Sequence, residues 1–171
     1  MADTARGGPL HLLDRWLYRQ GRPNRVARLM NGASSALFAT GFVLPGRYMT
    51  LEVRGRRTGR RIALPVVVAD HEGGRYLVSM LGENASWVRN VRASGGSAVL
   101  RHGRRDTVHL EEVEPSGRAP ILRRYLAVAP GARAHIPVDR RAPEAEFAAI
   151  ADRYSVFRIT VTPPEVTTVD P

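Results

Sequence analysis

Apolar and polar residues alternate in the middle of the chain, and this alternation predicts β-strands. Met49, Leu51 and Val53 are separated by polar residues, which is typical of a strand with one buried face. An almost unbroken apolar run over residues 62–69 indicates a strand that is buried on both faces. Shorter strand patterns occur in further segments, at residues 76–79, 98–101, 107–113 and 157–161.

Helical periodicity dominates the start of the chain and returns between and after the strands. Leu10, Leu13 and Leu17 share one helical stripe, and a second amphipathic pattern covers residues 26–37. We expect these two basic amphipathic helices, within residues 1–45, to pack on the strands. Other helices are expected at residues 86–93, at 121–129 and after Pro143.

The order of these elements predicts an α+β fold. Neighbouring strands are mostly joined by connections of hairpin length, so the sheet should be antiparallel. About six strands without a long exposed edge favour closure into a β-barrel with helices packed outside. We expect a single domain over residues 1–171, in which residues 46–171 form the barrel and residues 1–45 form a helical segment packed on it.

The formal net charge of +10 comes entirely from arginine, because the chain contains no lysine. It also contains no cysteine, which excludes disulfides and thiolate metal sites and fits a cytoplasmic protein. The five histidines show no metal-ligand spacing, so no metal site is expected. The pattern predicts neither a signal peptide nor a helix that spans a bilayer.

A strongly basic chain raises the question of nucleic acid. The arginines are spread over the whole sequence, and aromatic residues make up only 6% of it. Single-strand binders combine basic residues with interleaved stacking residues, which the arginine-rich segment 54–61 lacks. Nucleic-acid binding is therefore not expected, although nonspecific binding to phosphate remains open. Hydrolase and nucleotide-binding motifs are also missing from the sequence.

The segment 54–61 carries five arginines and is interpreted as a hairpin turn beside an anion-binding site. Arg56, Arg57 and Thr58 offer guanidinium and hydroxyl donors for a phosphate. A second set of donors for an anion is expected at the start of helix 86–93, where the first backbone N–H groups have no partner within the helix. Ser86 is the expected N-cap of this helix. The simpler interpretation, that these arginines are merely solvated, stays open.

Trp87 and Asn90 share one face of the same helix, because they are three residues apart. A tryptophan and an amide placed in this way either belong to the core or border a ligand.

These segments also carry a family resemblance. GRRTGRRIALPV, followed along the chain by YLVSMLGENASWVRNVRA, resembles the deazaflavin-dependent nitroreductase family over residues 48–113. The shared pattern is G-R-x-T-G, a proline six residues after its second glycine, and then S…G…W-x-x-N. APGARAHIPVD and YSVFRITV resemble later segments of nitroreductases and quinone reductases. The chain departs from the pattern at Met80 and Leu81, where relatives have a basic residue and a Gly-Gly pair, and its loop before Trp87 is shorter.

The resemblance implies a split β-barrel that binds the deazaflavin coenzyme F420, or FMN as some relatives in the wider group do. The residues it places near the phosphate-bearing tail are Arg56, Arg57 and Thr58. Those that would border the ring are Pro65 and Val66. Backbone contacts would come from Ser79, Met80, Leu81 and Gly82, and the site would be closed by Trp87 and Asn90.

The implied reaction is hydride transfer from reduced coenzyme F420 to an electron-poor acceptor such as a quinone or a nitroaromatic compound. No catalytic residue is assigned, because the cofactor carries the chemistry. The candidate proton donors are Tyr48, Tyr125 and Tyr154, and the role of a buried anchor is favoured for each of them. Two alternatives stay open: an FMN-binding split-barrel oxidoreductase, and a non-enzymatic barrel that binds a ligand or nucleic acid. Peripheral contact of the N-terminal helices with the inner face of the membrane is a further hypothesis. The sequence assigns no oligomeric state.

Overall fold

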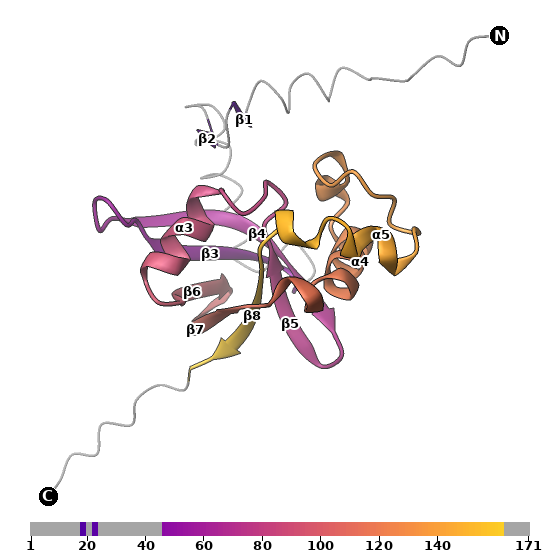
Figure 1. The fold of residues 1–171 in the computed structure, drawn as a ribbon. Helices are drawn as coiled ribbons and strands as arrows, with labels where there is room; N and C mark the ends of the chain where they lie inside the picture. Colours follow the sequence, from indigo (N-terminus) through magenta and orange to yellow (C-terminus); the bar gives the residue numbers. More distant parts are fainter. Residues whose placement is uncertain (1–17, 20–21, 24–45, 163–171) are drawn as a thin grey trace, which may run out of the picture.

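The structure is a computed structural model that describes residues 18–19, 22–23 and 46–162 (Figure 1). The first two ranges form a short antiparallel pair, β1 (Tyr18–Arg19) with β2 (Arg22–Pro23). The two helices expected within residues 1–45, and their packing on the barrel, lie outside the described residues and stay predictions.

Six strands form a closed barrel in the order β3-β4-β5-β8-β7-β6, and every neighbouring pair is antiparallel (Figure 1). The strands are β3 (Tyr48–Arg54), β4 (Arg61–His71), β5 (Gly74–Val78), β6 (Ser97–His102), β7 (Arg104–Glu112) and β8 (Val156–Val161). The predicted α+β fold, with an antiparallel split barrel of six strands, is therefore confirmed.

The barrel interior is filled by alternate residues of its strands. Leu51 and Val53 of β3 point inward and are buried, together with Leu100 and Phe157 from other strands. The helix α3 (Ser86–Ala93) contributes Val88 and Val91 to the same cluster, so it is fixed to the barrel by apolar packing. Ser86 is the first residue of this helix, and Ala85, in an extended conformation, occupies the N-cap position without a side-chain bond. The prediction that Ser86 caps the helix is therefore wrong by one position.

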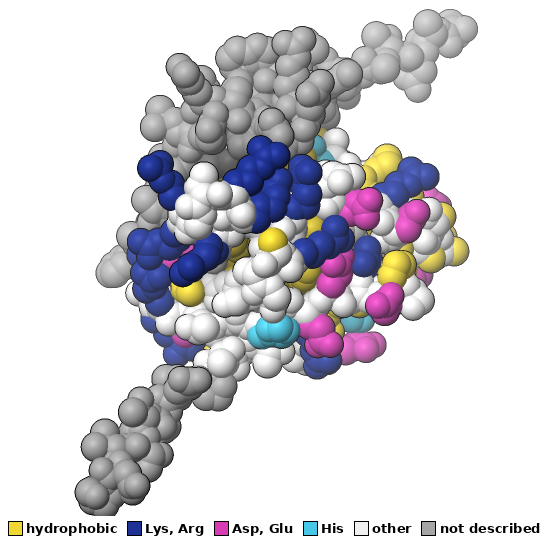
Figure 2. All heavy atoms as spheres, turned by 60° about the vertical axis from the view of Figure 1, so that its left-hand side comes forward, with side chains coloured by type: hydrophobic (Ala, Val, Ile, Leu, Met, Phe, Trp, Pro, Cys, Tyr) yellow, Lys and Arg dark blue, Asp and Glu magenta, His cyan; other side chains and the backbone are white. Residues whose placement is uncertain are grey.

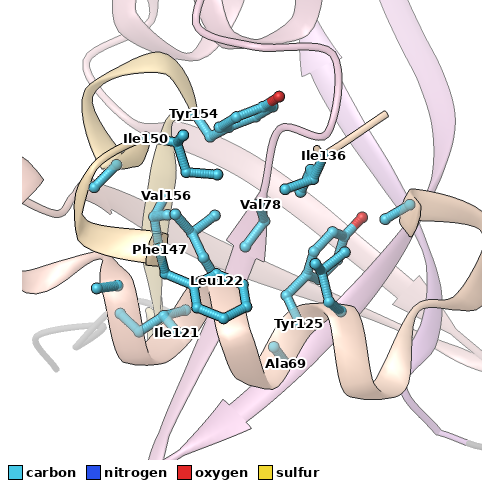
Figure 3. Packing of buried hydrophobic residues seen from close by; sticks show 14 of the residues in the cluster. Ala69, Val78, Ile121, Leu122, Tyr125, Ile136, Phe147, Ile150, Tyr154 and Val156 are labelled. Atoms are coloured by element: carbon cyan, nitrogen blue, oxygen red, sulfur yellow. The ribbon is translucent and has the colours of Figure 1, made fainter. Parts of the chain in front are cut away.

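A second core lies outside the barrel, where helices pack on β4 and β5 (Figure 3). Its centre is α4 (Ala119–Val128), whose Leu122 lies beside Phe147 and Val156 and whose Tyr125 lies toward Ile136. The other helical elements of this region are η1 (Pro115–Gly117), η2 (Pro130–Ala134), α5 (Glu144–Ala148) and η3 (Ala151–Arg153). The helices expected over 121–129 and after Pro143 are thus confirmed.

The apolar run in β4 is buried over only part of its length. Val68 and Ala69 are buried, because Val68 faces the barrel interior and Ala69 faces the outer cluster around α4. Ile62, near the turn, is 41% exposed, since α4 covers only the far half of β4 (Figure 1). The prediction of a strand buried throughout was therefore wrong at this end. No helix among the described residues is long and apolar enough to cross a membrane.

Candidate functional site

The arginine turn (residues 55–60) joins β3 to β4. Its backbone closes on itself, because Gly55 N–H donates to the Arg60 carbonyl at 2.8 Å and Gly59 N–H donates to the Gly55 carbonyl at 2.8 Å. Gly59 has a φ of +67°, a conformation that glycine adopts without strain. The side chains of Arg56, Arg57 and Thr58 are exposed. The turn therefore presents guanidinium groups and a hydroxyl to solvent, where an anion can reach them.

One contact joins the arginine turn to α3. The Oδ1 atom of Asn90 accepts two bonds from Arg56, one from its backbone N–H at 3.3 Å and one from Nη1 at 3.0 Å. Asn90 is only 3% exposed, and its Nδ2 donates no bond to any described residue. The structure thus brings together two residues that the sequence proposed separately, and it leaves a buried donor for a ligand.

The loop between β5 and α3 (residues 79–85) is held by its own polar groups. The Ser79 hydroxyl donates to the Gly82 carbonyl at 2.7 Å, and Gly82 N–H donates to the Ser79 carbonyl at 3.0 Å. Ser79 N–H donates to the Ser155 carbonyl at 2.9 Å. The N–H groups of Met80 and Leu81, in contrast, donate to no described residue. Four residues of this loop were predicted to contact the cofactor through their backbone, and among them Met80 and Leu81 have N–H groups left for a ligand.

A pocket of about 270 Å³ opens beside this loop. It is lined by Met80, Leu81, Gly82, His135, Arg153 and Tyr154. The Tyr154 hydroxyl donates to the His135 carbonyl at 2.9 Å, and burial raises the pKa of Tyr154. His135 and Arg153 are not predicted from the sequence, whereas Tyr154 is predicted as a buried anchor or a candidate proton donor. They come from η2, η3 and the segments that follow, far along the chain, and only the closed barrel brings them to residues 80–82.

Gly82 has a φ of +84°, and a Cβ added there would lie 3.3 Å from the Arg153 carbonyl oxygen. We therefore expect Gly82→Ala to lower the free energy of unfolding by about 1–2 kcal/mol, because a side chain in the left-handed region is strained. The measurement is urea unfolding, with Gly131→Ala as the control, since a Cβ at Gly131 meets nothing within 4 Å. Equal effects of the two substitutions would contradict this expectation.

Trp87 lies at the edge between core and solvent. It is half-buried, and its ring packs on Phe157 with the centroids 5.5 Å apart. Asn90 lies one turn further along α3, a rise of about 4.5 Å. The loop 79–85 therefore leads into one end of α3, and the arginine turn is attached nearer to the other end. A ligand that bridges both elements would lie along this helix.

Pro65 and Val66 lie on opposite faces of β4. Val66 packs against the cluster in the barrel interior, whereas Pro65 is opposite Thr50 on the outer face. Since consecutive strand residues point in opposite directions, a ring on one face of β4 meets the side chain of only one of them, and the expectation that both border the ring stays a prediction.

A buried carboxylate organises the arginines next to the turn. Glu52 is 4% exposed and forms ion pairs with Arg61 at 3.5 Å, Arg101 at 3.0 Å and Arg105 at 2.8 Å. One negative charge thus holds three positive ones, and the cluster stays cationic. Figure 2 shows arginine side chains gathered on the face of the molecule that carries the left-hand side of Figure 1. A cluster with a net positive charge attracts anions. Sequence reasoning missed it, although Glu52 occupies a polar position in the alternation of β3.

The far end of α3 is fixed by a paired carboxylate. Arg92 donates two bonds to Glu112 of β7, at 2.8 and 2.7 Å, and one to the Ser155 hydroxyl at 3.1 Å. The bond from Arg92 holds the pKa of Glu112 below its ordinary value of 4.5.

This ion pair predicts a dependence of stability on pH. Because the folded-state pKa of Glu112 is lowered, its stabilising effect is complete above pH 4.5 and is lost as the pH falls through the folded-state value. We expect the free energy of unfolding of the wild type to fall more steeply below this pH than that of Glu112→Gln. Urea unfolding at a series of pH values checks this. Parallel curves for the two proteins would contradict it.

No group of three or more His, Cys, Asp or Glu side chains suited to a metal ion occurs among the residues that the structure describes.

Comparison with known proteins places the chain in a family. The model of the F420H(2)-dependent quinone reductase family matches residues 24–143. Among solved structures, an F420-H2 dependent reductase is 19% identical, with a TM-score of 0.47, over 69% of this chain and 97% of its own. A 5-nitroimidazole antibiotic resistance protein from Bacteroides thetaiotaomicron is 9% identical, with a TM-score of 0.43, over 67% of this chain and 72% of its own. No curated protein matches the chain.

Both TM-scores lie below 0.5, so the assignment depends on the family model, which spans more than half of the sequence. The chain belongs to the F420H(2)-dependent quinone reductase family, and it is an oxidoreductase that depends on coenzyme F420.

Proposed function

We propose that the chain reduces a quinone or a nitroaromatic compound with reduced coenzyme F420, and that the arginine turn, the loop 79–85 and α3 together bind this coenzyme. The observation that carries the proposal is the set of donors left over at these elements: the exposed guanidinium groups of Arg56 and Arg57, and the buried Nδ2 of Asn90.

These donors fit an anionic cofactor. Arg56, Arg57 and Thr58 supply charge-assisted bonds for its phosphate-bearing tail. The N–H groups of Met80 and Leu81 supply uncharged donors at the other end of α3. The buried Nδ2 of Asn90 requires an acceptor, because a buried donor without a partner costs about 1–3 kcal/mol. A bound ligand with acceptor atoms along α3 satisfies this group.

The coenzyme supplies the hydride when bound, and the chain supplies binding, orientation and electrostatics. Trp87 and Val66 are both half-buried, and the exposed parts of their side chains provide apolar surface for the cofactor ring. The cationic cluster around Glu52 adds a positive field, which stabilises negative charge that develops on the acceptor.

Tyr154 holds its proton at the pocket wall. Its hydroxyl donates to the His135 carbonyl, and its raised pKa keeps it protonated at neutral pH. We assign it the role of an anchor that shapes the pocket, in which the acceptor lies next to Met80 and Leu81. The proton that accompanies the hydride then comes from solvent.

The experiment is an anaerobic assay in which reduced coenzyme F420 is mixed with the protein and either a quinone or a nitroaromatic compound. We expect oxidation of the coenzyme that requires both protein and acceptor. A parallel assay with reduced FMN distinguishes the flavin alternative. Turnover with FMN and none with coenzyme F420 would overturn the proposal.

A peripheral contact with anionic membranes would bring the site close to lipophilic quinones. Its support is the arginine-rich face in Figure 2 and the amphipathic pattern over residues 10–17 and 26–37. We expect the protein to pellet with vesicles that contain anionic phospholipid, and not with neutral ones. Failure to pellet at low ionic strength would remove this part of the proposal.

A further inference from the structure

We propose that Asn90 is a positioning residue, whose buried amide oxygen fixes the arginine turn in the conformation that receives the anionic part of the coenzyme. The identity of this ligand rests on the proposed function. We call the two hydrogen bonds from Arg56 to the Asn90 amide oxygen the clamp. The clamp rests on contacts within the chain, so the clamp and the identity of the ligand can be disproved separately.

The clamp uses a single acceptor atom for two kinds of donor. Asn90 Oδ1 accepts from the backbone N–H of Arg56 at 3.3 Å and from its guanidinium Nη1 at 3.0 Å. The first bond fixes the main chain of the turn, and the second fixes the direction of the arginine side chain. Because Asn90 is 3% exposed, water competes little for this oxygen, and the bonds are stronger than they would be on the surface.

The support of the clamp is rigid. Val88 and Val91, on the same helix as Asn90, are 0% and 1% exposed and pack in the barrel interior. Arg92, two residues further along the helix, donates two short bonds to Glu112 of β7. Asn90 is therefore held in place from both sides along the helix.

The arginine turn, in contrast, has little else to hold it. Its other hydrogen bonds among the described residues are internal, from Gly55 to Arg60, from Gly59 to Gly55 and from the Arg60 N–H to the Thr58 hydroxyl oxygen. Apart from the β-ladder that it closes, the bonds from this turn to the rest of the described chain are those to Asn90. Most of its side chains are exposed.

The consequence for binding is preorganisation. A turn that samples many conformations must be ordered when a ligand binds, and the ordering of each long side chain lowers the affinity. The clamp already orders part of the turn in the free protein, so less ordering is left for the binding step. Asn90 therefore contributes to affinity through Arg56, in addition to any contact that its Nδ2 makes.

Two substitutions separate the functions of the amide. Asn90→Leu removes the acceptor and the donor, whereas Asn90→Asp keeps an acceptor oxygen and replaces the donor with a second, negatively charged oxygen. The readout is hydrogen exchange of the Arg56 amide. We expect exchange to be about tenfold faster in Asn90→Leu, the change that loss of a bond of about 1.4 kcal/mol produces, and close to the wild-type rate in Asn90→Asp.

Arg57→Ala is the matched control, because Arg57 belongs to the same turn and has no bond to Asn90. It should leave exchange at Arg56 unchanged. Urea unfolding verifies that each variant is folded. Protection of the Arg56 amide that persists in Asn90→Leu would overturn the clamp.

The second readout is affinity for coenzyme F420, measured by quenching of tryptophan fluorescence. We expect Asn90→Leu to raise Kd about tenfold, because the turn must then be ordered when the ligand binds. Lost protection combined with an unchanged Kd would overturn the positioning role. If the wild type binds no coenzyme F420, the proposed function fails, while the exchange data still decide whether the clamp exists.

Discussion

Replacing Arg118 by methionine is expected to lower the free energy of unfolding by about 3–5 kcal/mol, because it removes a buried charge that several groups depend on. Arg118 is 6% exposed at the start of α4. Its guanidinium donates to the carbonyls of Val113, Ala151 and Tyr154 at 2.6, 3.2 and 3.1 Å, and to the Glu112 carboxylate at 3.3 Å.

These acceptors come from the end of β7, from η3 and from the segment that leads into β8. Methionine fills part of the volume but donates no bond, so the carbonyls are left buried without a partner. Urea unfolding measures the effect. The control is Arg123→Met, which replaces an exposed arginine on the same helix and should change stability by less than about 0.5 kcal/mol. Similar values for the two variants would contradict the role of Arg118 as the link between these segments.

The double variant Arg56→Ala/Arg57→Ala is expected to weaken binding of coenzyme F420 at least about hundredfold. Each guanidinium can form a charge-assisted bond worth about 1.5–3 kcal/mol, and two such losses exceed the 2.8 kcal/mol that corresponds to a factor of about one hundred. Both side chains are exposed in the turn, so the barrel should stay folded. Fluorescence titration gives Kd, and circular dichroism verifies the fold.

General attraction by the net charge must be separated from local contacts. Arg123→Ala/Arg140→Ala removes the same charge from exposed positions outside the proposed site. We expect this control to change Kd less than about threefold at physiological ionic strength, because exposed charges beyond a Debye length are screened. If both double variants weaken binding equally, the arginine turn is not a specific anion site.

The barrel could be predicted from the sequence because each strand follows a local pattern. The alternation in β3 and the turns of hairpin length leave few topologies other than an antiparallel sheet. A local pattern within one strand does not show how much of that strand a helix packed on it will cover. The exposed end of β4 at Ile62 was missed for this reason, since its burial depends on where α4 ends.

The candidate site was predictable as a set of segments and not as a set of contacts. The family pattern selected Arg56 and Asn90, but no local rule states that one donates to the other. Glu52 was missed because its partners come from β4, β6 and β7, which only the closed barrel brings together. The position of Arg153 and Tyr154 in the pocket wall was missed, because their contact with residues 80–82 depends on the pairing of β8 with β5, which are far apart in the sequence.

The central claim is that the arginine turn and the loop 79–85, joined by α3, hold coenzyme F420. Hydrogen exchange of the wild type with and without coenzyme F420 tests it most directly. The account predicts slower exchange in residues 55–60 and at Met80 and Leu81, and unchanged exchange in α4, which lies in the other core. Protection confined to other parts of the chain, or none at saturating coenzyme, would contradict the account.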